Sequence, residues 1–185
     1  MATAAFPENV MKLLVAQGAN RIEHPGGTLL DHVTRVRALL EQWGARRALQ
    51  SAGLCHAFYG TDGFHTALLD LSQRNELRHM IGEEVEQIVY LYASCDRRYA
   101  YLRLAAVTLD EFRDRLTGAI LTPSRQSLSD FMELTFANEL DIARHNLDFV
   151  TTHGSRLLAF FKRTRGLVSE AAWSDCLHLL DRARR

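Results

Sequence analysis

The sequence lacks a net charge, a long apolar run and a closely spaced pair of cysteines. Lysine and arginine together number 22, as do aspartate and glutamate, so the chain has none of the basic excess that is typical of nucleic-acid-binding proteins. Its longest apolar stretches, such as residues 102–109, are short and interrupted, whereas a membrane-spanning helix needs about 18 apolar residues. These absences predict a protein that binds neither nucleic acid nor a membrane.

The cysteines and the first residues of the chain bear on the compartment. Cys55, Cys95 and Cys176 are far apart in the sequence and, being three, cannot all pair with one another. The opening residues show neither the basic segment nor the long apolar core of a secretory signal. We therefore expect a cytoplasmic protein with reduced thiols.

Helical periodicity dominates what is present. The chain has 185 residues, 47% of them hydrophobic, and only 3 prolines, which suits one domain with one core. Thr28 and Asp31 form a capping pattern before an apolar-faced helix, and the helix after it is rich in small residues. Residues 102–107 and 118–121 are expected to form a small hairpin. The pattern predicts an all-α bundle of seven to nine helices, a single domain over 1–185, with its core at about 20–145 and C-terminal helices within 155–184.

Two of the eight histidines lie on predicted apolar helix faces. His32 occurs in LLDHVTRV and His56 in AGLCHAFYG. A buried polar group without a partner is costly, so each needs a ligand, a metal or a hydrogen bond. Five other histidines stand in polar or terminal surroundings and are expected to be ordinary surface residues: His65, His79, His145, His153 and His178.

These two histidines carry a family resemblance. HPGGTLLDH, AGLCHAFYGTDGF, IGEEVEQIVYLYASCDR and FANELD follow one another in the chain, and over residues 20–145 this order resembles a small group of HD-like proteins. The resemblance implies the HD-domain superfamily, metal-dependent phosphohydrolases and diiron oxygenases that hold metal between packed helices. It implies an HD-like helical bundle, with His32 as the first ligand and His56 as the histidine of the His-Asp pair.

The departures from that pattern fall on the carboxylates. Ala57 stands where the family has the aspartate of the pair, and Asn138 best fits the late-helix aspartate. An amide is a weaker ligand than a carboxylate for hard cations. Glu139 and Asp141 are close in sequence, but helical spacing predicts that they face away from Asn138.

Three interpretations remain open. In the first, a divalent ion (Fe, Mn or Zn) binds His32 and His56 and activates water or dioxygen, with a third ligand taken from His24, His79, Asp96 or Glu139. In the second, the pocket is free of metal, and a buried histidine beside Asp31 or Asp96 acts as a base. In the third, the histidines are structural, and the protein is a catalytically inactive interaction or ligand-binding module.

The sequence thus predicts an inter-helical pocket for a small-molecule substrate or ligand, with metal-assisted hydrolysis or oxygenation as the implied chemistry. Arg97 is available to pair with an anionic group. An apolar face on the last two helices leaves a homodimer open. The candidate residues are metal ligands His32 and His56, catalytic groups His56, Asp96, Arg97 and Glu139, and substrate-binding groups Tyr59, Thr61 and Asn138.

Overall fold

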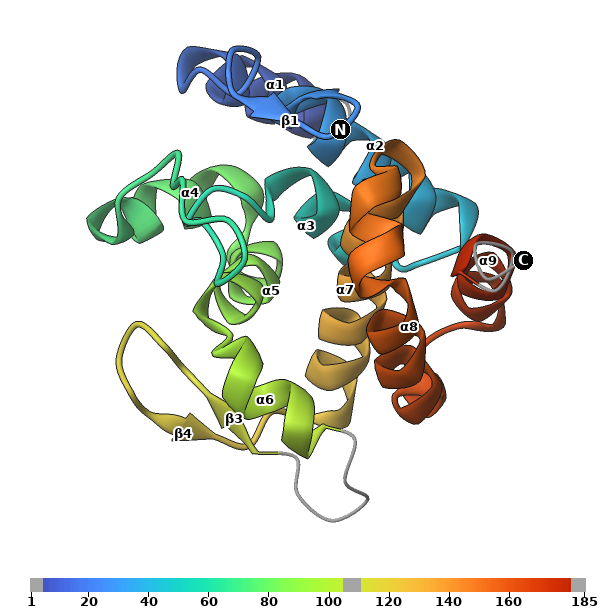
Figure 1. Ribbon diagram of the computed structural model, residues 1–185. Coiled ribbons are helices and arrows are strands. Elements are labelled where there is room, and N and C mark those ends of the chain that lie inside the picture. Colours follow the sequence, from blue (N-terminus) through green and yellow to red (C-terminus); the bar gives the residue numbers. More distant parts are fainter. Residues whose placement is uncertain (1–4, 105–110, 181–185) are drawn as a thin grey trace.

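The computed structural model describes residues 5–104 and 111–180 and confirms an all-α fold in which the helices surround one core (Figure 1). Within these residues none of the helices has the length and apolar character needed to cross a membrane. The α-helices of the described residues are α1 Ala5–Ala16, α2 Leu29–Gln42, α3 Arg47–Cys55, α4 Arg74–Ile81, α5 Glu83–Ser94, α6 Arg97–Arg103, α7 Arg125–His145, α8 Leu147–Arg163 and α9 Glu170–Leu180, with short 3₁₀ turns at Leu71–Gln73 and Arg165–Leu167.

Two small antiparallel hairpins accompany the helices. Strand β1 (Glu23–His24) pairs with β2 (Gly27–Thr28), and β3 (Phe112–Arg113) pairs with β4 (Ile120–Leu121) beside α6 (Figure 1). The hairpin predicted from residues 102–107 and 118–121 is therefore correct in its later strand and wrong in its partner. Residues 102–103 end α6, residues 105–107 lie outside the described residues, and the strand that pairs with β4 comes later in the chain.

Helix α2 begins where its capping pattern predicted. The Thr28 hydroxyl accepts a hydrogen bond from the Asp31 amide at 3.3 Å, and the Asp31 carboxylate accepts one from the Thr28 amide at 2.9 Å. These reciprocal bonds satisfy amides that the first turn of a helix leaves free. The face that follows, Leu29–His32–Val33–Val36–Leu40, is buried, so the cap places His32 inside the core.

Close approach between α2 and α3 depends on a small residue. A Cβ atom added at Gly53 would lie 2.6 Å from Leu40 Cδ1 and 3.4 Å from the Arg37 Cα atom. Glycine therefore lets the two backbones come together, within a helix whose sequence is rich in small residues. His56 caps the C-terminus of α3, and its ring centroid lies 5.2 Å from that of His32.

Helix α7 is the central element. It contacts α2, α3, α5, α8 and α9, and in Figure 1 it runs through the middle of the molecule behind α8. Its residues from Asp130 to Asp141 are almost all buried, including the polar side chains of Asn138, Glu139 and Asp141. Buried polar groups of this kind require partners, and α2 and α6 supply them.

The three cysteines behave as expected of thiols in a packed interior. Cys55, Cys95 and Cys176 are all buried and free. Burial raises the pKa of the Cys176 thiol to about 12, with the nearby Asp175 carboxylate adding to the effect. A protonated buried thiol is a poor nucleophile, and these residues act as core side chains.

Candidate functional site

A cavity of about 310 Å³ opens between α2, the end of α3, the loop that follows it, and α7. Its volume is at the small end of the range for small-molecule sites. The polar residues along its wall come from five separate segments of the chain. They are Glu23 and His24 from β1, His32 from α2, His56 and Thr61 from the end of α3 and its loop, Arg97 from α6, and Asn138, Glu139 and Asn146 from α7 and its C-cap.

His32 is the most constrained of these side chains. Its Nδ1 lies 2.7 Å from Asp141 Oδ2, its Nε2 lies 3.1 Å from Asn138 Oδ1, and only 1% of the residue is exposed. A carboxylate can only accept, so the Nδ1 atom carries the hydrogen that is donated to Asp141. Asn138 Oδ1 is also an acceptor, so its contact with Nε2 is a hydrogen bond only when the ring carries both hydrogens or when the Asn138 amide is turned over. Helix α7 therefore fixes the orientation of the ring and contacts both of its nitrogens.

Asp141 is held as an anion from both sides. Arg35 donates from Nε to Oδ1 at 2.7 Å and from Nη2 to Oδ2 at 3.0 Å. Burial acts to raise the pKa of the Asp141 carboxyl, but hydrogen bonds from His32 and Arg35 outweigh it and bring the pKa down to about 2. At neutral pH the group is thus a carboxylate, able to orient His32 and to stabilise a positive charge on its ring.

His56 contributes a neutral imidazole. Its Nδ1 donates to the Gly53 carbonyl oxygen at 2.8 Å, and the residue is 2% exposed. Burial, followed by the neighbouring His32, lowers the pKa of His56 to about 3. With the Nδ1 hydrogen committed to a backbone carbonyl, Nε2 is the acceptor of this ring.

His24 closes the site from the β1–β2 hairpin. Its ring stacks on that of His32 with 4.0 Å between centroids and meets Phe64 edge-on at 5.7 Å. Burial, together with His32, lowers the pKa of His24 to about 4. Arg35 ties the hairpin down, since Nη2 donates to Pro25 O at 2.9 Å and Nη1 to Gly26 O at 3.1 Å.

An ion pair forms another part of the wall. Arg97 Nη1 donates to Glu139 Oε1 at 3.0 Å, and the same carboxylate oxygen accepts from Asn138 Nδ2 at 3.3 Å. The Arg97 backbone amide donates to Asp62 Oδ2 at 3.0 Å, which anchors the start of α6. The carboxylate and the guanidinium on this side of the cavity therefore neutralise one another.

Most of the residues predicted from the sequence meet here. His32, His56, Thr61, Arg97, Asn138 and Glu139 all line the one cavity. The expectation that Glu139 and Asp141 would face away from Asn138 is wrong. Asn138 and Asp141 are three residues apart, which places them on one helix face where both contact His32. Glu139 reaches back to the Asn138 amide.

Two predicted site residues lie elsewhere. The Asp96 carboxylate caps α6, accepting from the Tyr99 amide at 2.9 Å, and it is absent from the cavity wall. The Tyr59 hydroxyl donates to the buried Glu86 at 3.2 Å and does not close the cavity mouth. In both cases a nearer partner takes the polar group, the helix end for Asp96 and, for Tyr59, a buried carboxylate that is also paired with Arg74.

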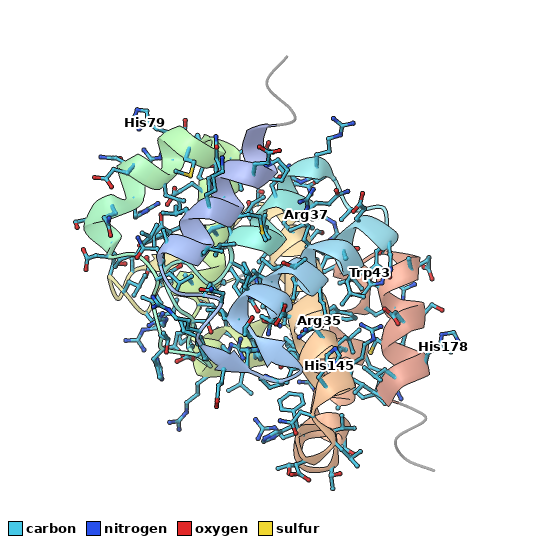
Figure 2. All side chains as sticks on the ribbon, turned by 90° about the horizontal axis from the view of Figure 1, so that it is seen from above. Arg35, Arg37, Trp43, His79, His145 and His178 are labelled. Carbon is cyan, nitrogen blue, oxygen red and sulfur yellow. The ribbon has the colours of Figure 1, made fainter. Side chains whose placement is uncertain are left out.

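Other histidines and carboxylates considered for the site are also remote from it. His79 is exposed at the outer edge of the molecule, as is His178 (Figure 2), and the His79 Nδ1 atom contacts the Asn75 carbonyl oxygen. Asp31 is occupied in the cap of α2 and is exposed. The carboxylate beside the buried histidine is Asp141, not Asp31 or Asp96.

Asp141, which contacts His32, and Arg35, which pairs with Asp141, are the functional residues that sequence reasoning missed. The motif DHVTR places Arg35 three residues after His32, on one helix face. FANELD likewise places Asp141 three residues after Asn138. Read together, these two spacings could have indicated that α2 and α7 join through a histidine, a carboxylate and an arginine.

The described residues contain no group of three or more His, Cys, Asp and Glu side chains arranged to hold a metal ion. What the cavity offers a cation is a smaller set, the two imidazoles of His32 and His56 and the amide oxygen of Asn138. A catalytic zinc usually has three protein ligands and an open position, and an amide oxygen also suits harder ions.

Comparison with known proteins gives a family model without an assigned activity. A model described as a domain of unknown function (DUF6817) matches residues 13–97, which is less than half of the chain. The matched segment contains His24, His32, His56 and Arg97, whereas Asn138, Glu139 and Asp141 lie beyond it. Neither the curated proteins nor the solved structures contain a significant match.

Proposed function

We propose that the chain is a small-molecule enzyme in which His32 acts as a general base, oriented by Asp141, in the cavity between α2 and α7. The observation that carries this proposal is the 2.7 Å contact between His32 Nδ1 and Asp141 Oδ2 in the wall of a 310 Å³ cavity. A carboxylate on one ring nitrogen fixes the tautomer in which the other nitrogen can take a proton.

The proposed chemistry uses the residues along the wall in distinct roles. When the Asn138 amide turns away from it, His32 Nε2 removes a proton from a water molecule or from a substrate hydroxyl, and Asp141 stabilises the imidazolium that results. The oxygen so activated attacks an electrophilic centre, and the proton on His32 returns to the leaving group. Asn138 and His56 orient the reacting group, and the Arg97–Glu139 pair shapes the adjoining wall.

The experiment compares wild type with His32→Gln and Asp141→Asn in an aqueous extract of small metabolites, followed by mass spectrometry. We expect compounds that wild type consumes and both variants turn over at least about a hundredfold more slowly, the usual contribution of a general base. Asp175→Asn is the control, because Asp175 pairs with Arg144 and Trp43 outside the cavity. If all four proteins turn over the same compounds equally, or if wild type consumes no compound, the enzyme proposal is refuted and a binding module is favoured.

A metal-assisted reaction is the second candidate, and the ring orientations favour it. Metal-binding histidines typically donate their other ring hydrogen to a carboxylate or a backbone carbonyl. His32 Nδ1 faces Asp141 and His56 Nδ1 faces the Gly53 carbonyl oxygen. The Nε2 atom of His56 is then left for a ligand, and that of His32, now in contact with Asn138 Oδ1 at 3.1 Å, becomes a ligand when the amide oxygen turns to the same ion. His32, His56 and Asn138 would hold the ion, which would supply an activated water or bind dioxygen.

Elemental analysis for iron, manganese and zinc tests this candidate in protein purified without chelators. We expect near-stoichiometric metal that disappears in His32→Ala and in His56→Ala. Ala57→Asp, a change in the cavity wall, should increase metal retention if the HD-like ligand geometry is present. Unchanged metal content in that variant would count against both the metal site and the proposed relation to the HD-domain superfamily.

Two broader proposals concern the protein as a whole. A cytoplasmic location is supported by the three buried cysteines, which are all unpaired. A homodimer stays a prediction, for which sedimentation velocity over a range of concentrations is the direct measurement.

A further inference from the structure

The charges around the cavity cancel in pairs. Asp141 is neutralised by Arg35, with 2.7 Å between Oδ1 and Nε, and Glu139 is neutralised by Arg97 at 3.0 Å. The two ion pairs therefore supply no free counter-charge to a bound ion.

A charged ligand would lose its hydration in this cavity without gaining a countercharge. Removing an ion from water is strongly unfavourable unless an opposite charge and hydrogen bonds replace the solvent. Among the buried carboxylates of the wall each already has its cation, and Arg97 already has its anion. Glu23, the other carboxylate of the wall, is exposed. The balance disfavours a phosphate, a carboxylate or an ammonium group at the buried end.

The buried end instead presents a hydrogen-bond acceptor. His56 Nδ1 donates to the Gly53 carbonyl oxygen, so Nε2 of this 2% exposed ring has only a lone pair to offer. A ligand group that donates a hydrogen fits such an atom. Asn138, beside it in the wall, provides an amide that can donate or accept, and a hydroxyl can satisfy both.

The less buried part of the wall is apolar. Phe64, Ile142 and Phe149 line the cavity and are partly exposed, with His24 packed edge-on against Phe64. Apolar and aromatic walls with a few convergent polar groups are the usual composition of small-molecule sites. This part suits a flat apolar body attached to the polar end of the ligand.

We propose that the ligand of this site is an uncharged molecule with an apolar body and a hydroxyl group, and that the hydroxyl enters first and donates to His56 Nε2. The inference rests on the proposed function for the place of the site and adds the class of ligand. Because the one hydrogen of this hydroxyl is donated to His56, the group that His32 deprotonates is a water molecule or a second hydroxyl.

Four probes that share one aromatic body separate the alternatives: benzyl alcohol, benzylammonium, benzoate and phenyl phosphate. Binding to the ¹⁵N-labelled full chain is followed through the backbone amides of Thr61, Gly63 and Arg97, which line the cavity. We expect saturable millimolar binding of benzyl alcohol and at least about tenfold weaker binding of the three ions. Equal or tighter binding of any ion at the same amides overturns the ligand class, as does a failure of benzyl alcohol to bind.

Two charge variants test the cause of the preference. Glu139→Gln leaves Arg97 unbalanced and should move the preference toward benzoate, whereas Arg97→Met leaves Glu139 unbalanced and should move it toward benzylammonium. Asp175→Asn, outside the cavity, should leave all four affinities unchanged. If the order of affinities is the same in both charge variants as in wild type, charge balance does not set the preference and the proposal fails.

The outcome is separable from that of the proposed function. His32→Gln keeps the Arg97–Glu139 pair and His56, so it should abolish turnover while retaining the order of affinities among the four probes. If His32→Gln loses turnover but wild type prefers benzoate among the four probes, the role of His32 as a general base is supported and the uncharged ligand class is refuted. The reverse result, preference for benzyl alcohol in a protein without turnover, would sustain the ligand class alone.

Discussion

Arg35 and Asp141 form a two-point ion pair that joins α2 to α7 beneath the candidate site. The same guanidinium donates to the carbonyl oxygens of Pro25 and Gly26. In Figure 2, Arg35 and His145 lie close together on this side of the molecule, and His145 Nε2 is 3.8 Å from Asp141 Oδ1. One arginine thus connects the carboxylate that orients His32 with the hairpin that carries His24.

Replacing Arg35 with methionine should destabilise the fold by about 3–5 kcal/mol, the usual cost of leaving one partner of a buried pair uncompensated. Asp141 is 1% exposed and would keep only histidine partners. Arg37→Met on the same helix is the matched control, for which the described residues show no ion pair with Arg37; it should change stability by no more than about 0.5 kcal/mol. Urea denaturation measures both, and similar losses in the two variants would contradict the role given to Arg35.

The hairpin turn depends on a glycine that approaches another side chain. Gly26 has φ of +80°, and a Cβ added there would lie 2.5 Å from His145 Cγ. Gly26→Ala should therefore combine the backbone cost of a left-handed alanine, about 1–2 kcal/mol, with a steric cost of about 1–3 kcal/mol. Gly44→Ala isolates the first cost, because Gly44 has φ of +72° and no atom within 4 Å of the added Cβ.

A second substitution isolates the steric part. In a His145→Ala background the clash is absent, so Gly26→Ala should then cost about as much as Gly44→Ala does in wild type. Thermal or urea denaturation of the four variants forms a double-mutant cycle. A coupling energy near zero would show that His145 moves aside without cost, contrary to the close packing seen here.

Local signals predicted the helices well and the partners of the site poorly. Thr28 and Asp31 predicted the start of α2 because a cap is decided within four residues. His32 and His56 were identified because a polar residue on an apolar helix face is visible in the sequence. Asp141, in contrast, contacts a residue 109 positions away, and no local pattern encodes which of several carboxylates lies opposite His32.

The errors share a physical cause. Residue type and position along the chain place Asp96 and Tyr59 in the site, yet each hydrogen-bonds a group outside the cavity. Asp96 accepts from an amide at the N-terminus of α6, and Tyr59 donates to the buried Glu86. The free energy of a hydrogen bond to a helix end or to a buried carboxylate is similar to that of a hydrogen bond to a ligand. The packing between helices decides which of these partners a polar side chain reaches, and the sequence alone does not determine that packing.

The reassignment of Tyr59 has a measurable consequence. Tyr59→Phe removes one hydrogen bond from Glu86, which keeps its pair with Arg74, and should cost about 0.5–1.5 kcal/mol of stability, while benzyl alcohol binding stays as in wild type. Thr61→Val changes a residue of the cavity wall and removes the acceptor of the Phe64 amide, so it should weaken benzyl alcohol binding. A loss of benzyl alcohol binding in Tyr59→Phe would instead support the sequence-based assignment of Tyr59 to the mouth of the cavity.

Stability should fall on mild acidification because of the buried imidazoles. The pKa of His56 is about 3 in the folded chain against 6.5 for an ordinary histidine, and that of His24 is about 4. Between these values and pH 6.5 the unfolded chain binds more protons, so the free energy of unfolding falls as the pH falls through this window. Asp141 affects stability at lower pH. Its pKa of about 2 is below the ordinary 3.8, so its contribution to the free energy of unfolding is lost only as the pH drops from about 4 toward 2.

The variant His56→Gln isolates the contribution of one imidazole to the pH dependence of stability. Each ring that protonates only on unfolding contributes a slope of about 1.4 kcal/mol per pH unit once the pH is below 6.5, so urea denaturation at pH 6, 5.5 and 5 should give a slope reduced by nearly that amount in the variant. His178→Gln is the control, because His178 lies at the surface on the far side of α9 (Figure 2). If His56→Gln and wild type lose stability in parallel, then His56 binds a proton in the folded chain. Its Nε2 would then be a donor, and the preference for a hydroxyl that donates to it would lose its basis.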